Sequence, residues 1–590
     1  MKLFVQLLLF LWTSMVVAVV WCHDENPEAL NRKHLHTIMN VLDKSLDPCT
    51  EFYQYVCSNW LDNHKEYSDQ YHTVGEALKF HGNLEILEYL EKTPADNMPE
   101  FVRALKTFHG SCVEREVFEL EELMRTMEKE EKITWALLTP QDGEQGFNWP
   151  STLAQFRKYG FNDMFVSYSR KFQDATTGVT YLNRPDYEEK FNYLNSYQLN
   201  GYNESIPLPE GTMSFEELWK LVDRFEDKLR EIPRENVEAR QFKFHELPYD
   251  WLGGYLTSLM HPQAVDENMV ISIDNVAYME ALDKLLKEYD QGFLCRYLEL
   301  RFLNYMEMAN KRHSSHECLT TGTSFMPLAG EWIYGQLHPK IASEIPKIQQ
   351  MFENTVRNIN KTLYGTKSPL IPKEFFRQLE TMQLKIGMLP EGNHKELLEN
   401  YYSGLKLQSH DYYGNYLKLL EFHYQLENAE NRKEFKYDAE IAPIYVETSN
   451  TLQLPLGLLR PPVYHAAFED IFKQSSLAHL MAMGIFEAFP VEENGGLDAN
   501  HVQKIAGLTS LHSAFEIFFS SAQPEEILRY QTLFQLTSLE QIKQIFFINA
   551  IHQQCEWYFN NVERVNFVIN NLSDFIETFD CKFNGLIKMF

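Results

Sequence analysis

Positive charge is scarce in this sequence. Its 590 residues include 54 Lys and Arg against 83 Asp and Glu, which gives a formal net charge of −29 at pH 7. Such an acidic chain repels phosphate backbones, and it holds no run of Lys and Arg that would offset the repulsion. We therefore exclude nucleic acid as a partner.

Glycine, proline and the common nucleotide-binding motifs are sparse or missing as well. With 26 Gly and 24 Pro, the composition is that of neither a disordered nor a collagen-like chain. The sequence has no internal repeat, no glycine-rich phosphate loop, no dinucleotide fingerprint and no Gly-x-Ser-x-Gly elbow. Repeat proteins and the enzymes that carry those motifs are thereby excluded.

Apolar residues, by contrast, are plentiful. They make up 44% of the chain, enough for one large or two moderate hydrophobic cores. Segments such as Phe215–Glu231, Tyr278–Tyr289 and Lys347–Leu363 have apolar residues three and four apart, which is typical of helices, whereas strand-like alternation is rare. We predict a mainly α fold with a small β component, arranged as a compact two-lobed protein.

The N-terminus carries an apolar leader. Met1-Lys2 precedes an uncharged, mostly apolar run from Leu3 to Cys22, whose length suits a secretory signal or a single membrane anchor. The small residues ending at Ala18 favour a signal peptide over residues 1–18, cleaved between 18 and 22, and a type II anchor is the alternative. Both send the chain into the secretory pathway, so we expect a secreted, extracellular protein.

The secretory pathway permits disulfide bonds and glycans, and the sequence offers sites for both. It contains eight cysteines. Three Asn-x-Ser/Thr acceptors for N-linked glycans occur, at Asn203, Asn360 and Asn571. We therefore expect a disulfide-bonded glycoprotein.

The most specific motif follows the leader. From Asp47 to Trp60 the chain reads DPCTEFYQYVCSNW, in which two cysteines bracket an aromatic, helix-like turn. This string resembles the N-terminal signature of the neprilysin family of zinc metallopeptidases, which includes the endothelin-converting enzymes. Further matches follow in the family's order, at Ser111-Cys112, Cys318–Pro339, Pro455–Pro462, Phe546-Phe547 and Phe579–Cys581.

The resemblance implies a neprilysin-like fold with two lobes around an internal chamber. Residues 47–390 would form the N-terminal region, which includes a helical lid domain. Residues 391–590 would form the thermolysin-like peptidase region, packed with residues 47–80.

The resemblance also implies a set of disulfides. Three pairs would form, Cys49–Cys581, Cys57–Cys555 and Cys112–Cys318. Cys22 and Cys295 have no partner in the family. They could bond each other if Cys22 survives signal cleavage, and Cys295 is otherwise left single.

The family's metal helix is present but its motif is not. That helix carries His-Glu-x-x-His, whose two His bind zinc from one helix face while the Glu acts as general base. Counting from Pro462 places the helix on Ser475–Phe489, with Ser475 or Ser476 as its N-cap.

Neither metal-binding His occurs at the expected place. The motif falls on residues 486–490, where Phe486 and Pro490 replace the two His and only Glu487 remains. A shift by one residue moves the His positions to Ile485 and Phe489, which cannot bind zinc either.

The third zinc ligand is missing as well. In the family it is the Glu of Glu-Asn-Ile-Ala-Asp, and the matching string here is Gln503–Gly507. Gln503 supplies an amide, a poor zinc ligand, and Gly507 replaces the Asp that would orient a ligand His. The interval between Phe486 and Gln503 is also much shorter than in the family.

The positions that hold substrate in the family are only partly kept. Its Asn-Ala-aromatic-Tyr strand falls on Ala442–Tyr445, where Pro443 removes an edge-strand donor. Its transition-state His falls near Tyr558. Arg564 does match the family's Arg, and a guanidinium suits a peptide carboxylate. Arg564 is thus a candidate peptide-binding remnant, with a structural ion-pair role as the alternative.

These losses leave open whether the chain is an enzyme and favour an inactive one, with no catalytic residues, no metal and no cofactor. It resembles the degenerate neprilysin-like proteins of insects. We predict a secreted pseudopeptidase that binds peptides, or a secreted or cell-surface protein, or modulates active relatives. One alternative is a zinc metalloendopeptidase that cleaves extracellular peptides through an unconventional site. The other is a structural glycoprotein.

Overall fold

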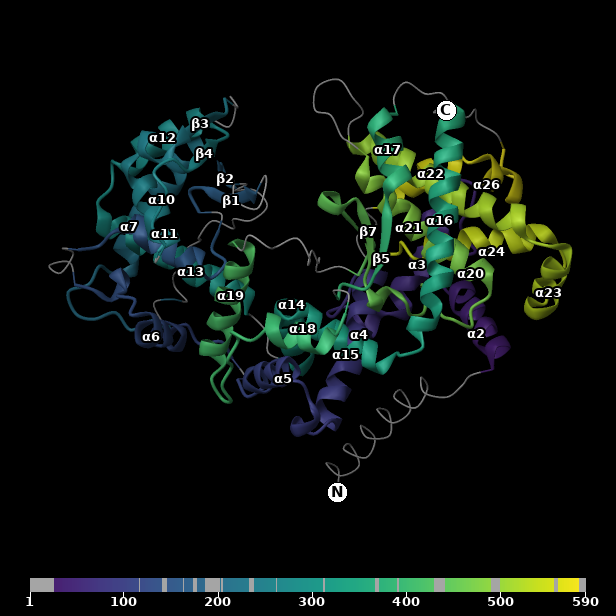
Figure 1. The fold of residues 1–590 in the computed structure, drawn as a ribbon, viewed down its shortest axis with the longest axis horizontal. Helices are drawn as coiled ribbons and strands as arrows, with labels where there is room; N and C mark the ends of the chain where they lie inside the picture. Colours follow the sequence, from purple (N-terminus) through teal and green to yellow (C-terminus); the bar gives the residue numbers. More distant parts are fainter. Residues whose placement is uncertain are drawn as a thin grey trace. The chain divides into compact units, whose positions relative to one another are not determined.

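The chain folds into two compact units. The computed structural model describes residues 26–115, 117–140, 146–162, 164–172, 178–185, 202, 205–232, 238–261, 263–310, 314–366, 371–389, 392–428, 441–489, 499–556 and 561–582. The first unit is drawn from residues 1–86, 331–389 and 436–590, and the second from 87–330 and 390–435. Both are mainly helical with one small sheet each (Figure 1), as the sequence predicts.

The first unit contains a three-stranded sheet and most of the long helices. Its elements are α2 (Pro27–Asn40), α3 (Phe52–Asn63), the start of α4 (Val74–Lys92), most of α15 (Pro327–Leu337), α16 (Ile341–Thr366), α17 (Lys373–Thr381), β5 (Gln383–Ile386), β6 (Ile444–Val446), β7 (Thr451–Leu454), α20 (Asp470–Lys473), α21 (His479–Ile485), α22 (Ala499–Ser521), α23 (Pro524–Phe534), α24 (Leu539–His552), α25 (Val562–Asn570) and α26 (Ser573–Thr578). The strand order is β5-β7-β6, with β5 parallel and β6 antiparallel to β7.

Two apolar cores hold this unit together. One joins α2 and α3 to the C-terminal helices α22 to α26, around side chains such as Tyr53, Phe515 and Phe547. The other lies among the sheet, α16, α17, α21 and the start of α22, where Phe375 and Ile485 are fully buried. Figure 1 shows α16, α21 and α22 beside strands β5 and β7. Segments from both ends of the chain therefore share one interior.

Two disulfides reinforce that arrangement. Cys49–Cys581 and Cys57–Cys555 form, with Cα atoms 5.5 and 5.3 Å apart. They close loops across 532 and 498 residues, which restricts the unfolded chain. Both pairs confirm the bonding that the family resemblance implies.

The second unit contains a four-stranded sheet and its own helices. Its elements include α5 (Glu100–Val113), α6 (Leu120–Glu131), α7 (Trp149–Arg157), β1 (Ser167–Phe172), β2 (Gly178–Asn183), α10 (Phe215–Glu231), β3 (Arg240–Lys243), α11 (Asp250–Met260), β4 (Val270–Ile273), α12 (Val276–Leu286), α13 (Gln291–Ala309), α14 (Ser315–Phe325), α18 (His394–Tyr401) and α19 (Tyr412–Asn428). The strand order is β1-β2-β4-β3. The predicted Cys112–Cys318 disulfide joins α5 to α14.

The remaining cysteines and the three glycan acceptors differ in how far the structure describes them. Cys295, on α13, is buried with its Sγ 3.6 Å from Thr152 Oγ1, and burial raises the pKa of the thiol to about 12. Cys22, which could pair with it, lies outside the described residues. Asn360 on α16 and Asn571 after α25 are partly exposed, and Asn203 is not described. The glycans and the Cys22–Cys295 pair stay predictions.

The apolar leader, residues 1–25, also lies outside the described residues. None of the helices in the described part of the chain has the length and apolar character that a bilayer crossing needs.

Helix α21 begins differently from what the sequence predicts. The helical path starts at Asp470, continues through a π turn over Gln474–Ala478, and becomes α21 at His479. Ser475 and Ser476 lie inside the π turn, and their hydroxyls donate to the carbonyls of Ile471 and Phe472. The expectation that either serine caps this helix is therefore wrong, because both bond backward along a helix that has already begun.

A histidine links α22 to α26. Nδ1 of His512 lies 2.9 Å from Oδ2 of Asp574, and this hydrogen bond raises the pKa of His512 above its usual range. A raised pKa means that the pair stabilises the fold below the ordinary His pKa. The contribution disappears as the pH rises through the folded-state pKa.

Asp574→Asn is therefore expected to destabilise the protein more at about pH 5.5 than at about pH 8.5. Because both side chains are partly exposed, the loss at the lower pH should be about 0.5–1 kcal/mol. Thermal melting at the two pH values measures it, with Glu577→Gln, an exposed change on α26, as the control. Equal losses at both pH values would contradict the proposed link.

Candidate functional site

Helices α21, α22 and α25 meet around a small cavity. His479 and Met483 reach it from α21, one turn apart, and Gly507 and Leu511 face them from α22. Arg564 closes it from α25. The cavity measures about 10 Å³, which is barely room for one water molecule.

His479 is the polar group at the centre of this contact. It is only 2% exposed. Burial, assisted by the positive charge of Arg564, lowers the pKa of His479 to about 3. The imidazole is therefore neutral at physiological pH. Sequence reasoning missed His479, although its spacing of four from Met483 places both on one helix face.

The positions that the sequence assigns to the zinc-binding motif lie elsewhere. Phe486 and Phe489 are buried in the apolar core, with ring centroids 5.5 and 4.9 Å from that of Phe375. Neither lines the cavity that His479 shares with Gly507. The structure thus brings Gly507 and Arg564 together, as residues of one cavity wall, and keeps Phe486 in the core.

The remaining predicted positions are exposed or not described. Gln503, one turn before Gly507 on α22, is exposed. Pro490 and Tyr558 lie outside the described residues, so their assignment stays a prediction.

The side chains in this region do not fit a catalytic zinc ion. Such a site needs three protein ligands, drawn from His, Cys, Asp and Glu, with one position open. The faces of α21 and α22 that meet supply only His479. Within the described ranges, no three His, Cys, Asp or Glu side chains form a group that could hold a metal ion.

Glu487 has a structural partner instead. Its Oε2 accepts the backbone N–H of Tyr445 at 3.0 Å. Tyr445 belongs to β6, an edge strand of the three-stranded sheet. Two residues earlier, on the same side of the strand, Pro443 has no N–H. An incoming strand would need backbone N–H groups from this edge. Residue 443 has none, and the N–H of residue 445 already donates to Glu487.

Gly484 allows α21 to approach the sheet this closely. A Cβ atom at residue 484 would lie 2.9 Å from Pro443 Cβ and 2.9 Å from Leu452 Cδ1. No side chain fits there without displacing the strand. The glycine is therefore explained by packing.

A larger cleft opens beside this edge. It holds about 280 Å³, close to the ~300 Å³ lower limit of ordinary ligand pockets. Its lining residues are Thr73, Val74, Gly75, Glu76, Leu78, Ile441, Ala442, Pro443, Leu458, Val463, Leu480, Gln553, Gln554, Cys555, Glu556 and Asn561. The cleft therefore includes Ala442 and Pro443, the positions that the family resemblance assigns to substrate backbone.

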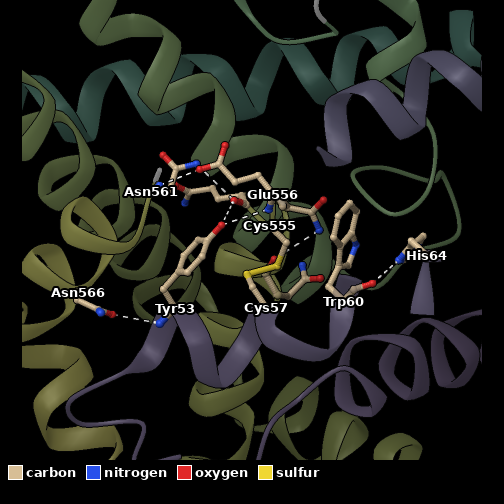
Figure 2. Close-up of a disulfide and its surroundings, with 11 residues drawn as sticks. Tyr53, Cys57, Trp60, His64, Cys555, Glu556, Asn561 and Asn566 are labelled. Atoms are coloured by element: carbon tan, nitrogen blue, oxygen red, sulfur yellow. Dashed lines mark hydrogen bonds between the residues drawn. A yellow bond between two sulfur atoms is a disulfide. The ribbon is translucent and has the colours of Figure 1, made fainter. Parts of the chain in front are cut away.

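One wall of the cleft is fixed by α3. The hydroxyl of Tyr53 donates to the carbonyl of Gln554 (3.1 Å) and accepts the N–H of Glu556 (3.2 Å). Between them, Cys555 is bonded to Cys57 (Figure 2). Glu556 also pairs with Thr73 in an isolated antiparallel bridge. The segment from 554 to 556 is thus held on both sides.

Arg564 lies behind this wall. Its Nη2 donates to Gln554 Oε1 at 3.0 Å, and burial lowers the pKa of the guanidinium below its usual range. Gln554 lines both the small cavity and the cleft, whereas Arg564 lines only the small cavity. The cation therefore already has a protein partner on the far side of the cleft wall.

Comparison with known proteins identifies the family. The sequence profile of "Peptidase family M13" matches residues 48–388. The chain belongs to this family, the one that includes neprilysins and endothelin-converting enzymes. It is 23% identical to Neprilysin-11 of Caenorhabditis elegans, 21% to human Endothelin-converting enzyme 1 and 20% to Neprilysin-2 of Drosophila melanogaster, over 76%, 72% and 79% of its length. It covers 61%, 62% and 69% of those proteins, about three fifths of the first two.

Solved structures agree on the fold. PEPO from Lactobacillus rhamnosis matches with a TM-score of 0.63 at 13% identity, over 91% of this chain and 97% of that one. A Haemonchus galactose-containing glycoprotein complex matches with a TM-score of 0.62 at 16% identity, over 93% and 96%. Identities this low establish the neprilysin-like fold alone.

The buried His479 predicts acid sensitivity. Because the folded-state pKa of His479 is lowered, its imidazole binds a proton below about pH 6.5 in the unfolded chain but stays neutral in the folded protein. Stability therefore falls as the pH drops below that value. His479→Leu should reduce the pH slope of the unfolding free energy by about 1.4 kcal/mol per pH unit.

Chemical denaturation between about pH 4.5 and pH 7 measures this slope. His34 and His552, whose pKa values burial lowers to about 4 and about 3, should maintain a residual slope in the variant. The control is His36→Gln, which changes an exposed His of α2. Identical slopes for wild type and His479→Leu would refute the assignment.

Proposed function

We propose that this chain is a non-catalytic, secreted member of peptidase family M13 that binds peptide segments in the cleft beside β6. The observation that carries the proposal is the pairing of α21 with α22. Where the two helices meet, they present His479 and Met483 to Gly507 and Leu511, a set with one zinc ligand. The leader sequence and the disulfides support secretion.

The cleft supports a retained binding role. It keeps about 280 Å³ of space and a wall fixed by a disulfide and by Tyr53. Apolar side chains such as Leu78, Val463 and Leu480 line it together with amides and carboxylates, the mixture that binding sites use. Since Pro443 and Glu487 close the donors of the β6 edge, ligand would bind through side-chain contacts in the cleft rather than by strand addition.

Two other functions compete with this one. A zinc endopeptidase acting on extracellular peptides would need ligands from outside the described residues. A structural glycoprotein would have no ligand at all. Partners, whether peptides or a secreted or cell-surface protein, are part of the proposal, as is modulation of active relatives.

Metal content and peptide binding test the proposal together. We expect the purified full-length protein to contain far less than one zinc per chain and to leave a fluorogenic peptide library uncleaved, because its ligand set is incomplete. It should still retain peptides from a mixed pool. Elemental analysis, a cleavage assay with and without phosphoramidon, and affinity capture provide the three measurements.

Cleft-filling variants locate the binding. Ala442→Trp should abolish peptide capture by occupying the cleft, whereas Ala522→Trp, a half-buried position outside the cleft, should not. Near-stoichiometric zinc with phosphoramidon-sensitive cleavage would overturn the non-catalytic assignment. Failure to retain any peptide would overturn the binding role.

A further inference from the structure

The charges of the cleft point to the kind of peptide it takes. Among the described residues that line it, Glu76 and Glu556 are the only charged side chains. Arg564, the residue that would suit a peptide carboxylate, lies behind the wall with Gln554 as its partner. We infer that the cleft selects a positively charged side chain, Lys or Arg, next to an aliphatic residue. This inference rests on the proposed peptide-binding function.

Each carboxylate has one oxygen committed and one available. Glu76 Oε2 accepts the backbone N–H of His72 at 2.6 Å, and Glu556 Oε1 accepts that of Asn561 at 2.8 Å. Their other oxygens, Oε1 of Glu76 and Oε2 of Glu556, accept no hydrogen bond from the described residues. An ammonium or guanidinium group binds such oxygens by charge-assisted hydrogen bonds.

A buried amide adds an independent reason. Gln553 lines the cleft and is 8% exposed. Its Nε2 donates to the carbonyls of Asn549 (3.4 Å) and Pro462 (3.5 Å), which orients the amide. Its Oε1 is buried and has no hydrogen-bond partner in the described part of the chain. An unpaired buried acceptor is costly, and a donor group of a ligand would satisfy it.

The nearby basic side chains do not cancel the negative charge of Glu76 and Glu556. Arg564 is close enough for Glu556 to affect its pKa, but burial dominates that pKa and the guanidinium donates to Gln554. The ring of His72 lies 3.7 Å from Glu76 and carries charge only when protonated. The charged side chains that line the cleft are therefore the two carboxylates, set among apolar side chains, with the unpaired oxygen of Gln553 buried in the wall beside them.

Peptides without charged ends isolate the side-chain preference. A random pool of N-acetylated, C-amidated hexapeptides is passed over the immobilised full-length protein, and the retained peptides are sequenced by mass spectrometry. We expect enrichment of Lys or Arg next to Leu, Ile or Val. Affinity for an enriched peptide should also fall as salt rises, because the attraction is electrostatic.

Charge-removing variants test the assignment of residues. Glu76→Gln with Glu556→Gln keeps the hydrogen-bond acceptors and removes both charges, and should weaken binding of an enriched peptide about tenfold. Glu51→Gln with Glu563→Gln makes the same change of net charge at exposed positions outside the cleft and should leave binding unchanged. Arg564→Gln should alter affinity less than the cleft pair.

The outcomes separate this inference from the function on which it rests. If the wild type retains no peptide, the binding function fails, and this inference fails with it. If peptides bind but are enriched in acidic residues, or bind equally to both double variants, the cationic preference alone is wrong. If a pool with free C-termini binds better and Arg564→Gln abolishes that gain, the ligand is a carboxylate and the inference is overturned.

Discussion

The cleft depends on one tie between the two ends of the chain. Tyr53 lies on α3, within the Asp47–Trp60 signature, and places its hydroxyl between Gln554 and Glu556, beside the Cys57–Cys555 bond. A hydroxyl that both donates and accepts fixes the backbone on either side of Cys555, while the covalent bond fixes the residue between. The cleft wall, the position of Glu556 and the partner of Arg564 all follow from this contact.

The first unit is also held together by interactions that do not involve a metal. The interior of the first unit is apolar, and its two long-range disulfides restrict the unfolded chain whether or not zinc is bound. In a metal site, buried His and Glu are stabilised by the ion that they bind. Without such an ion, buried polar side chains need other partners or are better replaced by apolar ones. Met483, Gly507 and Leu511 supply no polar side chain to the small cavity, and His479 is the buried polar residue among them.

The sequence predicted the architecture well because its signals there are local or strongly specific. Helix α10 has the bounds Phe215–Glu231 that the apolar spacing indicated, since Ser214 and Glu217 form a capping box at its start. The three disulfides came from a family pattern in which cysteines and their aromatic neighbours are distinctive.

The sequence could not predict which side chains of α21 point toward α22. A π turn adds a residue to one helical turn, so the helix that follows is rotated relative to a count that assumes an unbroken α-helix. Counting from Pro462 placed the start of the zinc-binding motif at Phe486. The α21 side chains that face Gly507 in the structure are instead those of His479 and Met483. Likewise, no sequence pattern shows that Gln553 Oε1 lacks a partner, because this depends on the distances between separate segments.

Glu487 has a structural role at the edge of the three-stranded sheet. A general base needs a bound water to deprotonate, and the described residues around Glu487 include no metal-binding group. Its carboxylate instead accepts the N–H of Tyr445 at the edge of the sheet. An exposed edge donor invites pairing with another chain, so satisfying it internally limits non-specific strand addition. In the proposed function, recognition therefore relies on side chains in the cleft, where Glu76 and Glu556 are the charged residues, and not on the backbone of the edge strand.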